Sequence, residues 1–258
     1  MNGRHEDTPP PRAVVLDTDG VLLDSATAHA AAWKTAFDAC LAGRAADGAG
    51  DPAPFDADAE YRRLVDGRSR YDGAEAFLTS RGIRLPPGSP GDPPGRATVW
   101  AVAARKEAAF LDALAAGAVT AFPDAAEALT ALRALRVPCV AVSASRHART
   151  LLADTGLDRL LADVVDGGDA ARLALPGKPD PALFLHAAAL LGTRPGDTAV
   201  VEDALAGVRA ARRGGFGLVV GLDRAPDGRG TAPLREAGAD LVVPDLTALV
   251  RETWGGRR

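Results

Sequence analysis

Residues 13–21 of this 258-residue chain read AVVLDTDGV, a short apolar run that ends in two acids and a glycine. Such a run is typical of a buried strand that leads into a loop. Similar apolar runs recur at residues 137–142, 164–165, 199–201, 218–220 and 241–243. Patterns typical of helices lie between them, at residues 124–136, 147–154, 181–191 and 204–213. Strands that alternate with helices in this way predict an α/β fold with a doubly wound parallel sheet.

The interval from 26 to 120 breaks this alternation, because it holds Ala-rich helical patterns and no convincing buried strand. We expect helices over residues 27–42, 57–64, 71–80 and 98–116, with a Pro/Gly loop at 85–95. We interpret residues 26–120 as a helical cap domain inserted after the first strand. The α/β catalytic core then comprises residues 12–25 and 121–258, and residues 1–11 form a disordered N-terminal tail.

Composition narrows the choice of partner. The chain has 34 acidic and 30 basic residues and a net charge near −4, which gives no reason to expect nucleic acid or an anionic membrane. No apolar run approaches the roughly 18 residues of a membrane span, and the polar, Pro-rich start lacks the apolar region of a signal peptide. We therefore expect a cytoplasmic protein, a monomer or weak oligomer, that acts on a small molecule.

Polar side chains follow the predicted strands at the points where each strand ends. They are Asp17, Asp19, Ser143, Glu202 and Asp203. Ligands of open α/β sheets bind at the carboxyl ends of the strands, so we expect these side chains to converge on one site. Clustered carboxylates suit Mg²⁺, and a carboxylate can also attack phosphorus as a nucleophile. A second acid two residues later can act as a general acid and base.

Lysine is rare in this chain, whose basic residues are nearly all arginines. The lysines are Lys34, Lys106 and Lys178. A lysine in the sequence Gly-Lys-Pro at 177–179 suggests a place where a compact ammonium group is needed. Together with the Ser143 hydroxyl, Lys178 can supply the donors and the positive charge that a phosphoryl group requires.

Four segments in chain order carry a family resemblance. They are DTDGV at residues 17–21, SAS at 143–145, KP at 178–179 and ED at 202–203. In these motifs the chain resembles phosphotransferases of the haloacid dehalogenase superfamily, in the branch of β-phosphoglucomutase and its phosphatase relatives. The resemblance covers nearly the whole chain after Pro11 and implies a Rossmann-like core with a cap.

The resemblance implies a role for each core residue. Asp17 is the expected nucleophile, Asp19 the general acid and base, and Ser143 and Lys178 hold the phosphate. Mg²⁺ is the expected cofactor. Its implied ligands are the Asp17 carboxylate, the Asp19 backbone carbonyl and the Asp203 carboxylate, with Glu202 acting indirectly through the surrounding groups.

A second set of residues resembles the substrate contacts of the mutase branch. This set comprises Ser25, His29, Trp33, Arg70 and Ala144. His29 and Trp33 are four residues apart and share one helix face, and Arg70 is the expected ligand of a distal phosphate. Departures from the branch occur at Asp66, where lysine is usual, at Gly73, where serine is usual, and at residues 146–147, where lysine-asparagine is common.

Alternatives remain at this stage. The preferred function is Mg²⁺-dependent phosphoryl transfer on a small sugar phosphate, like that of β-phosphoglucomutase, and the main alternative is a sugar-phosphate phosphatase. A non-enzymatic phosphoaspartate switch is a remote third, because such receivers lack both a helical insertion after the first strand and an acid at the position of Asp19. His29 and Trp33 also fit plain core residues, and Arg70 fits a surface charge.

Overall fold

The computed structural model describes residues 9–46, 48 and 53–255, so most of the expected N-terminal tail lies outside the described residues. Its centre is a parallel six-stranded sheet with the strand order β5-β4-β1-β6-β7-β8. The strands are β1 (Ala13–Asp17), β4 (Cys139–Val142), β5 (Asp163–Val165), β6 (Thr198–Glu202), β7 (Leu218–Leu222) and β8 (Leu241–Val243). Each predicted apolar run contributes one strand, which confirms the predicted fold class.

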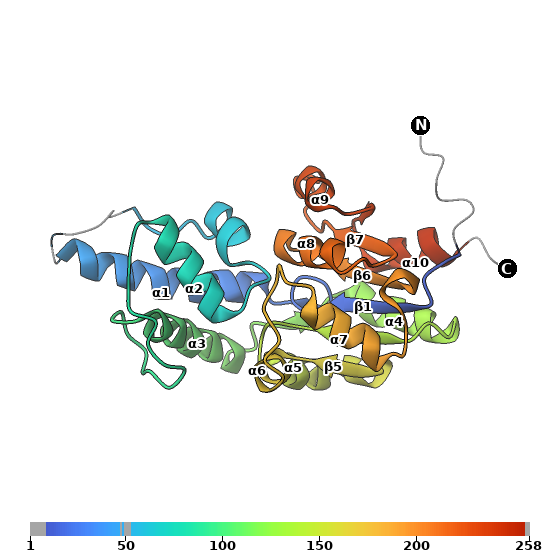
Figure 1. Cartoon of the computed structure of the whole chain (residues 1–258), viewed down its shortest axis with the longest axis horizontal. Helices are drawn as coiled ribbons and strands as arrows, with labels where there is room; N and C mark the ends of the chain where they lie inside the picture. The colour runs from blue at the N-terminus through green and yellow to red at the C-terminus, as the bar shows by residue number, and fades with distance from the viewer. Residues whose placement is uncertain (1–8, 47, 49–52, 256–258) are drawn as a thin grey trace.

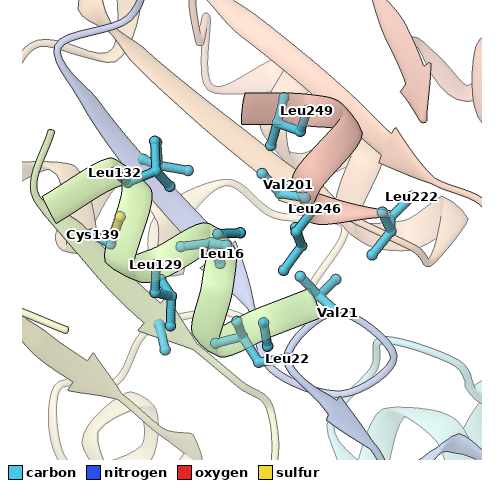
Figure 2. Close-up of a cluster of buried hydrophobic side chains, with 14 of the residues drawn as sticks. Leu16, Val21, Leu22, Leu129, Leu132, Cys139, Val201, Leu222, Leu246 and Leu249 are labelled. Carbon is cyan, nitrogen blue, oxygen red and sulfur yellow. The ribbon is translucent and has the colours of Figure 1, made fainter. Parts of the chain in front are cut away.

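Helices cover both faces of the sheet because successive strand side chains point to opposite sides. Val14 and Leu16 face the first layer, whereas Val15 faces the second. The first layer comprises α4 (Pro123–Ala134), α5 (Ala148–Asp154), η2 (Leu157–Leu160) and α10 (Leu246–Trp254). Figure 2 shows leucines of α4 and α10 in this layer around Leu16 and Val201. The second layer comprises α7 (Ala182–Leu190), α8 (Leu205–Arg213) and α9 (Thr231–Ala237).

Between two very short strands, the described residues form four helices, which extend away from the sheet (Figure 1). The strands β2 (Leu23–Asp24) and β3 (Thr120–Ala121) pair antiparallel, and this pairing brings the two ends of the insertion together. The helices are α1 (Ala26–Ala46), η1 (Tyr61–Val65), α2 (Arg70–Ser80) and α3 (Val99–Ala115). We call the region from α1 to α3 the helical segment.

The predicted helix at residues 57–64 is confirmed in part. Residues 57–58 form a turn, residues 59–60 are α-helical, and Tyr61–Val65 form the π-helix η1. The turn forms because Asp56 Oδ1 accepts the backbone N–H groups of Asp58 and Ala59, at 2.8 and 3.0 Å. An Asp side chain that accepts the N–H groups two and three residues later is a typical cap of a helix N-terminus, so Asp56 starts this helical stretch.

The helical segment has its own aromatic core. The Phe37 ring stacks on Phe77 with centroids 3.8 Å apart and on Trp33 at 4.7 Å, and the edge of Phe55 meets it at 5.0 Å. Gly73 lies against this core. A Cβ there would stand 3.2 Å from the Trp33 ring and 3.1 Å from Val65, so the absent side chain lets α2 approach α1 closely.

Cys40 and Cys139 are both free and buried, so they belong to the packed interior. Among the described helices, none is long and apolar enough to cross a membrane.

Phe37→Ala should lower the free energy of unfolding by about 3–5 kcal/mol, because it opens a cavity among stacked rings that are fully buried. Denaturant unfolding followed by tryptophan fluorescence measures the change, since Trp33 contacts the altered ring. Leu111→Ala is the control: Leu111 is 45% exposed, and its loss should cost under about 0.5 kcal/mol. Equal losses for the two variants would contradict a packed aromatic core.

Candidate active site

Lys178 joins the ends of two neighbouring strands. Its ammonium group contacts the Asp17 carboxylate at the end of β1 and the Glu202 carboxylate at the end of β6. All three residues are buried. Burial acts to lower the pKa of Lys178, but the two carboxylates outweigh it and raise the pKa above its ordinary value, so the ammonium stays charged.

Three carboxylates form a potential cation site. Oxygen atoms of Asp17, Glu202 and Asp203 all lie within 4.8 Å of one another. Gly20 makes this approach possible at a φ of +76°, because a Cβ there would stand 1.8 Å from Asp203 Oδ2. Within the described part of the chain, no hydrogen bond reaches the Asp203 carboxylate. Burial and neighbouring acids raise the pKa of both Asp17 and Asp203, which indicates a surplus of negative charge that a divalent cation would balance.

The residues therefore fit Mg²⁺, which prefers oxygen ligands. Both Glu202 oxygens are already engaged, one by Lys178 and the other by the backbone N–H of Ala204 at 2.8 Å. Asp17 Oδ2 accepts the backbone N–H of Asp19 at 3.0 Å, and Asp203 carries no such bond. The other Asp17 oxygen, Oδ1, is engaged by Lys178, so Asp203 is the best placed of the three to hold a cation directly.

Asp19 is held by three side-chain donors. Ser25 donates to Oδ1 at 2.6 Å and Ser143 donates to Oδ2 at 2.8 Å, while His29 Nε2 lies 3.3 Å from Oδ1. Burial acts to raise the pKa of Asp19, but His29 and the two hydroxyls outweigh burial and hold the pKa below its ordinary range. Asp19 is therefore a carboxylate in this arrangement. Ser25 and Ser143 are fully buried and act on Asp19 here.

A buried lysine stands behind His29. Lys106 Nζ lies 2.8 Å from His29 Nδ1 and 4.3 Å from the centroid of Phe110, on which the His29 ring stacks. Because an ammonium group only donates, Nδ1 must be the acceptor, and Nε2 carries the proton that faces Asp19. Burial and the Lys106 charge lower the pKa of His29, in agreement with a neutral ring.

Arg224 braces the loop that follows β1. Its guanidinium donates to the carbonyl oxygens of Gly20 and Val21, at 3.1 and 2.8 Å, and pairs with Asp124 at 2.9 Å. Asp124 in turn accepts the backbone N–H of Leu246 at 2.7 Å. The loop carrying Asp19 is thus fixed to α4 and α10 from outside the cavity.

A cavity of about 390 Å³ lies between the helical segment and the carboxyl edge of the sheet. The sheet side supplies Asp17, Asp19, Ala144, Lys178 and Asp203 to its lining. The helical segment supplies, among others, His29, Trp33, Tyr61, Asp66, Arg70, Lys106 and Glu107. Most predicted site residues therefore meet around one space, whereas Ser25, Ser143 and Glu202 stand behind it. Trp33 belongs both to the aromatic core and to the cavity wall.

Arg70 is already paired. Its Nη1 lies 2.9 Å from Glu107 Oε2, and the other Glu107 oxygen lies 2.8 Å from His147 Nε2. His147 directly precedes α5, so this chain of contacts connects the helical segment to the sheet side.

Asp66 brings another carboxylate to the cavity, directly after η1. The neighbouring Gly67 has a φ of +69°, and a Cβ there would stand 2.9 Å from the Ala204 Cβ, so this loop presses on the core. Burial, with the Glu202 charge, raises the pKa of Asp66 to about 7, although a hydrogen bond from Tyr61 opposes the rise. Asp66 thus adds to the crowding of acids around Lys178.

Comparison with known proteins places the chain in a family. The model of the haloacid dehalogenase-like hydrolases matches residues 11–215. The chain belongs to the haloacid dehalogenase-like hydrolase family. A β-phosphoglucomutase from Mycobacterium tuberculosis is 44% identical over 239 residues, which is 93% of this chain and 91% of that protein. The resemblance noted from the four motifs is thereby confirmed.

Two further proteins are similar to this chain. A trehalose-phosphate phosphatase from Mycobacterium leprae is 34% identical over 155 residues, which cover 60% of this chain and 34% of that protein. A solved hydrolase from Pseudomonas syringae shares the fold, with a TM-score of 0.72 and 24% identity over 93% of this chain and 96% of that one. Both mutases and phosphatases are thus among the relatives of this chain.

Sequence reasoning missed Lys106, Glu107 and Arg224 as site residues. One signal was available: Lys106 is one of three lysines in an arginine-rich chain, the same rarity that singled out Lys178. Glu107 and Arg224 carried no comparable signal. Their charged partners lie far away in the sequence, and single charged residues on helices and loops are usually solvated.

Lys106→Met should remove a buried charge that opposes folding. Burial lowers the pKa of Lys106 to about 8 from an ordinary value of 10.5, so between these pH values the unfolded chain binds more protons than the folded one. The stability of the wild type should therefore rise with pH across this window relative to the variant. We expect the variant to be more stable at pH 7 by on the order of 1–3 kcal/mol, with the advantage shrinking towards pH 10.

Denaturant unfolding of both proteins from pH 7 to pH 10 measures this difference. Lys34→Met, which removes a half-exposed lysine from α1, corrects for the loss of one positive charge. A Lys106→Met advantage that stays constant with pH would show that Lys106 is not the titrating group.

Proposed function

We propose that this chain is a phosphomutase of the β-phosphoglucomutase type, which transfers a phosphoryl group of a small sugar phosphate through Asp17. The observation that carries the proposal is the cavity, which is bounded on the sheet side by Asp17 and Lys178 and on the helical side by Arg70. Such a space suits a sugar with phosphate at both ends. The identity to β-phosphoglucomutase over 93% of the chain supports the same conclusion.

In this proposal the Asp17 carboxylate attacks phosphorus, and the bond to the sugar oxygen breaks as Asp19 gives that oxygen a proton. The reverse half-reaction transfers the phosphoryl group from Asp17 to another sugar hydroxyl, and Asp19 takes the proton of that hydroxyl. The structure has Asp19 as a carboxylate held by Ser25, His29 and Ser143, the form needed for this second role. Lys178 balances the charge on Asp17, and Ala144 is part of the cavity wall that would contact the substrate.

Mg²⁺ is the proposed cofactor, held by the carboxylates of Asp17 and Asp203 and by the Asp19 backbone carbonyl, with Glu202 positioning Lys178. When bound, it would offset the repulsion between these acids and the phosphate. The helical segment acts as a cap domain over the core, since it closes the cavity opposite the sheet and excludes water from Asp17. The proposed boundaries remain residues 26–120 for the cap and 12–25 with 121–258 for the core.

A sugar-phosphate phosphatase is the second candidate. Two observations favour it: Asp66 adds negative charge beside the acids, and Glu107 already pairs with the arginine that would hold a second phosphate. In a phosphatase, water takes the place of the acceptor hydroxyl and only one phosphate is held.

One assay separates the two candidates. With β-glucose 1-phosphate, Mg²⁺ and a trace of the 1,6-bisphosphate, we expect glucose 6-phosphate to form faster than inorganic phosphate. Asp17→Asn should lower both rates by at least about 10³-fold, because an amide cannot attack phosphorus. Asp24→Asn is the matched control, since Asp24 is exposed on β2 and lines no part of the cavity.

Two outcomes would contradict the proposal. Phosphate release that exceeds isomerisation would favour the phosphatase. Activity of Asp17→Asn above about a tenth of that of the wild type would reject Asp17 as the nucleophile.

EDTA should abolish both activities, and Mg²⁺ should restore them, with Ca²⁺ a poor substitute because it prefers more ligands at longer distances. In the same titration Gly20→Ala should require at least about tenfold more Mg²⁺, since the added methyl displaces Asp203. Calorimetric Mg²⁺ binding to the free protein provides a readout that needs no turnover. Full activity in chelator, or unchanged Mg²⁺ binding in Gly20→Ala, would count against this site.

A further inference from the structure

Glu107 occupies a central place at the helical side of the cavity. It lies on α3, with one carboxylate oxygen 2.9 Å from Arg70 on α2 and the other 2.8 Å from His147 before α5. The three side chains are each between 22 and 25% exposed. Glu107 therefore binds two partners at once, one from its own segment and one from the sheet side.

Arg70 differs in this respect from the other arginines of the cavity. Arg68 and Arg146 also line it, yet within residues 9–46, 48 and 53–255 neither forms an ion pair. The arginine predicted to hold the second phosphate is thus the one whose charge is already matched. A ligand that binds Arg70 therefore lies next to the Glu107 carboxylate.

Glu107 is an anion near neutral pH. Burial acts to raise its pKa, but the hydrogen bond with His147 and the charge of Arg70 outweigh burial and hold the pKa below its ordinary value. A phosphate dianion beside Arg70 would therefore face like charge at short range, and this repulsion is strong where the site is partly desolvated. A neutral hydroxyl would instead find a hydrogen-bond acceptor.

We propose that Glu107 sets the substrate selectivity of this site by competing with the second phosphate for Arg70. A sugar monophosphate binds with the Glu107–Arg70 pair intact and offers its distal hydroxyl to the carboxylate. A sugar bisphosphate must replace Glu107 on Arg70. The inference rests on the proposed function and adds a residue that chooses between the two ligand classes.

This competition has a use in a mutase. The bisphosphate must leave or turn round in the cavity before its second phosphate can reach Asp17. Very tight binding of the bisphosphate would therefore slow turnover. When the Glu107 carboxylate pairs with Arg70 again, it lowers the affinity of the site for the bisphosphate. The same residue leaves binding of the phosphate at Asp17 and Lys178 untouched, because it contacts neither.

The test measures binding without turnover, in the Asp17→Asn background with Mg²⁺. Calorimetry gives the dissociation constants of β-glucose 1-phosphate and of β-glucose 1,6-bisphosphate. Adding Glu107→Gln, which keeps the shape and removes the charge, should raise the preference for the bisphosphate by about tenfold. Glu252→Gln, a surface change of equal charge, should leave the preference as it was.

The pathway of the effect is tested by a cycle of variants. If Glu107 acts through Arg70, Glu107→Gln should no longer change the preference once Arg70→Ala is present. A preference that Glu107→Gln leaves unchanged, or an effect that persists without Arg70, overturns the inference. Failure of Asp17→Asn to bind either sugar phosphate overturns the substrate class of the proposed function instead, and the wild-type turnover assay tests that function separately.

Discussion

The site depends on one buried ammonium group, that of Lys178, shared between Asp17 and Glu202. Two carboxylates at the ends of adjacent parallel strands would repel each other in a dry interior, and the lysine holds them together. The strand order makes this possible, because β1 lies between β4 and β6 and directs the ends of all three to one edge. Ser143 follows β4, so its hydroxyl reaches Asp19 from the third strand. Removing Lys178 would leave buried charges unpaired and undo this edge of the sheet.

A second line of contacts runs from this edge into the helical segment. Asp19 meets His29 of α1, and His29 meets Lys106 of α3, whose ammonium lies over Phe110. The lysine is buried at a cost to stability, as its low pKa indicates, and it fixes the tautomer of the histidine that faces Asp19. The helical segment thus does more than cover the cavity, since it also determines which nitrogen carries a proton beside Asp19.

The sequence was informative where chemistry and strand pattern coincide. The apolar run before Asp17 and the short runs before Ser143 and Glu202 predicted both the strands and the convergence of their ends, because parallel strands share one carboxyl edge. The strands β2 and β3 could not be predicted, since two residues carry no periodicity and Leu23 pairs with Ala121 across the whole insertion. Nor could the π-helical form of η1, in which the Asp66 N–H bonds the Tyr61 carbonyl five residues earlier. Glu107 was beyond reach for a similar reason: its partners Arg70 and His147 are brought to it only by tertiary packing.

Arg70, on the helical side of the cavity, has a carboxylate partner before any ligand enters. Arg70 is matched by Glu107, while Asp66 hydrogen-bonds Tyr61 and feels Lys178 across the boundary with the core. A family member with a lysine in place of Asp66 would present a more positive cavity to a phosphate. In this chain a second phosphate that binds Arg70 must displace Glu107 from it, so its binding depends on the difference between two ion pairs and less on total positive charge. Acidic residues of the helical segment therefore determine the affinity for a bisphosphate, whereas the residues that carry out phosphoryl transfer at Asp17 lie at the edge of the sheet.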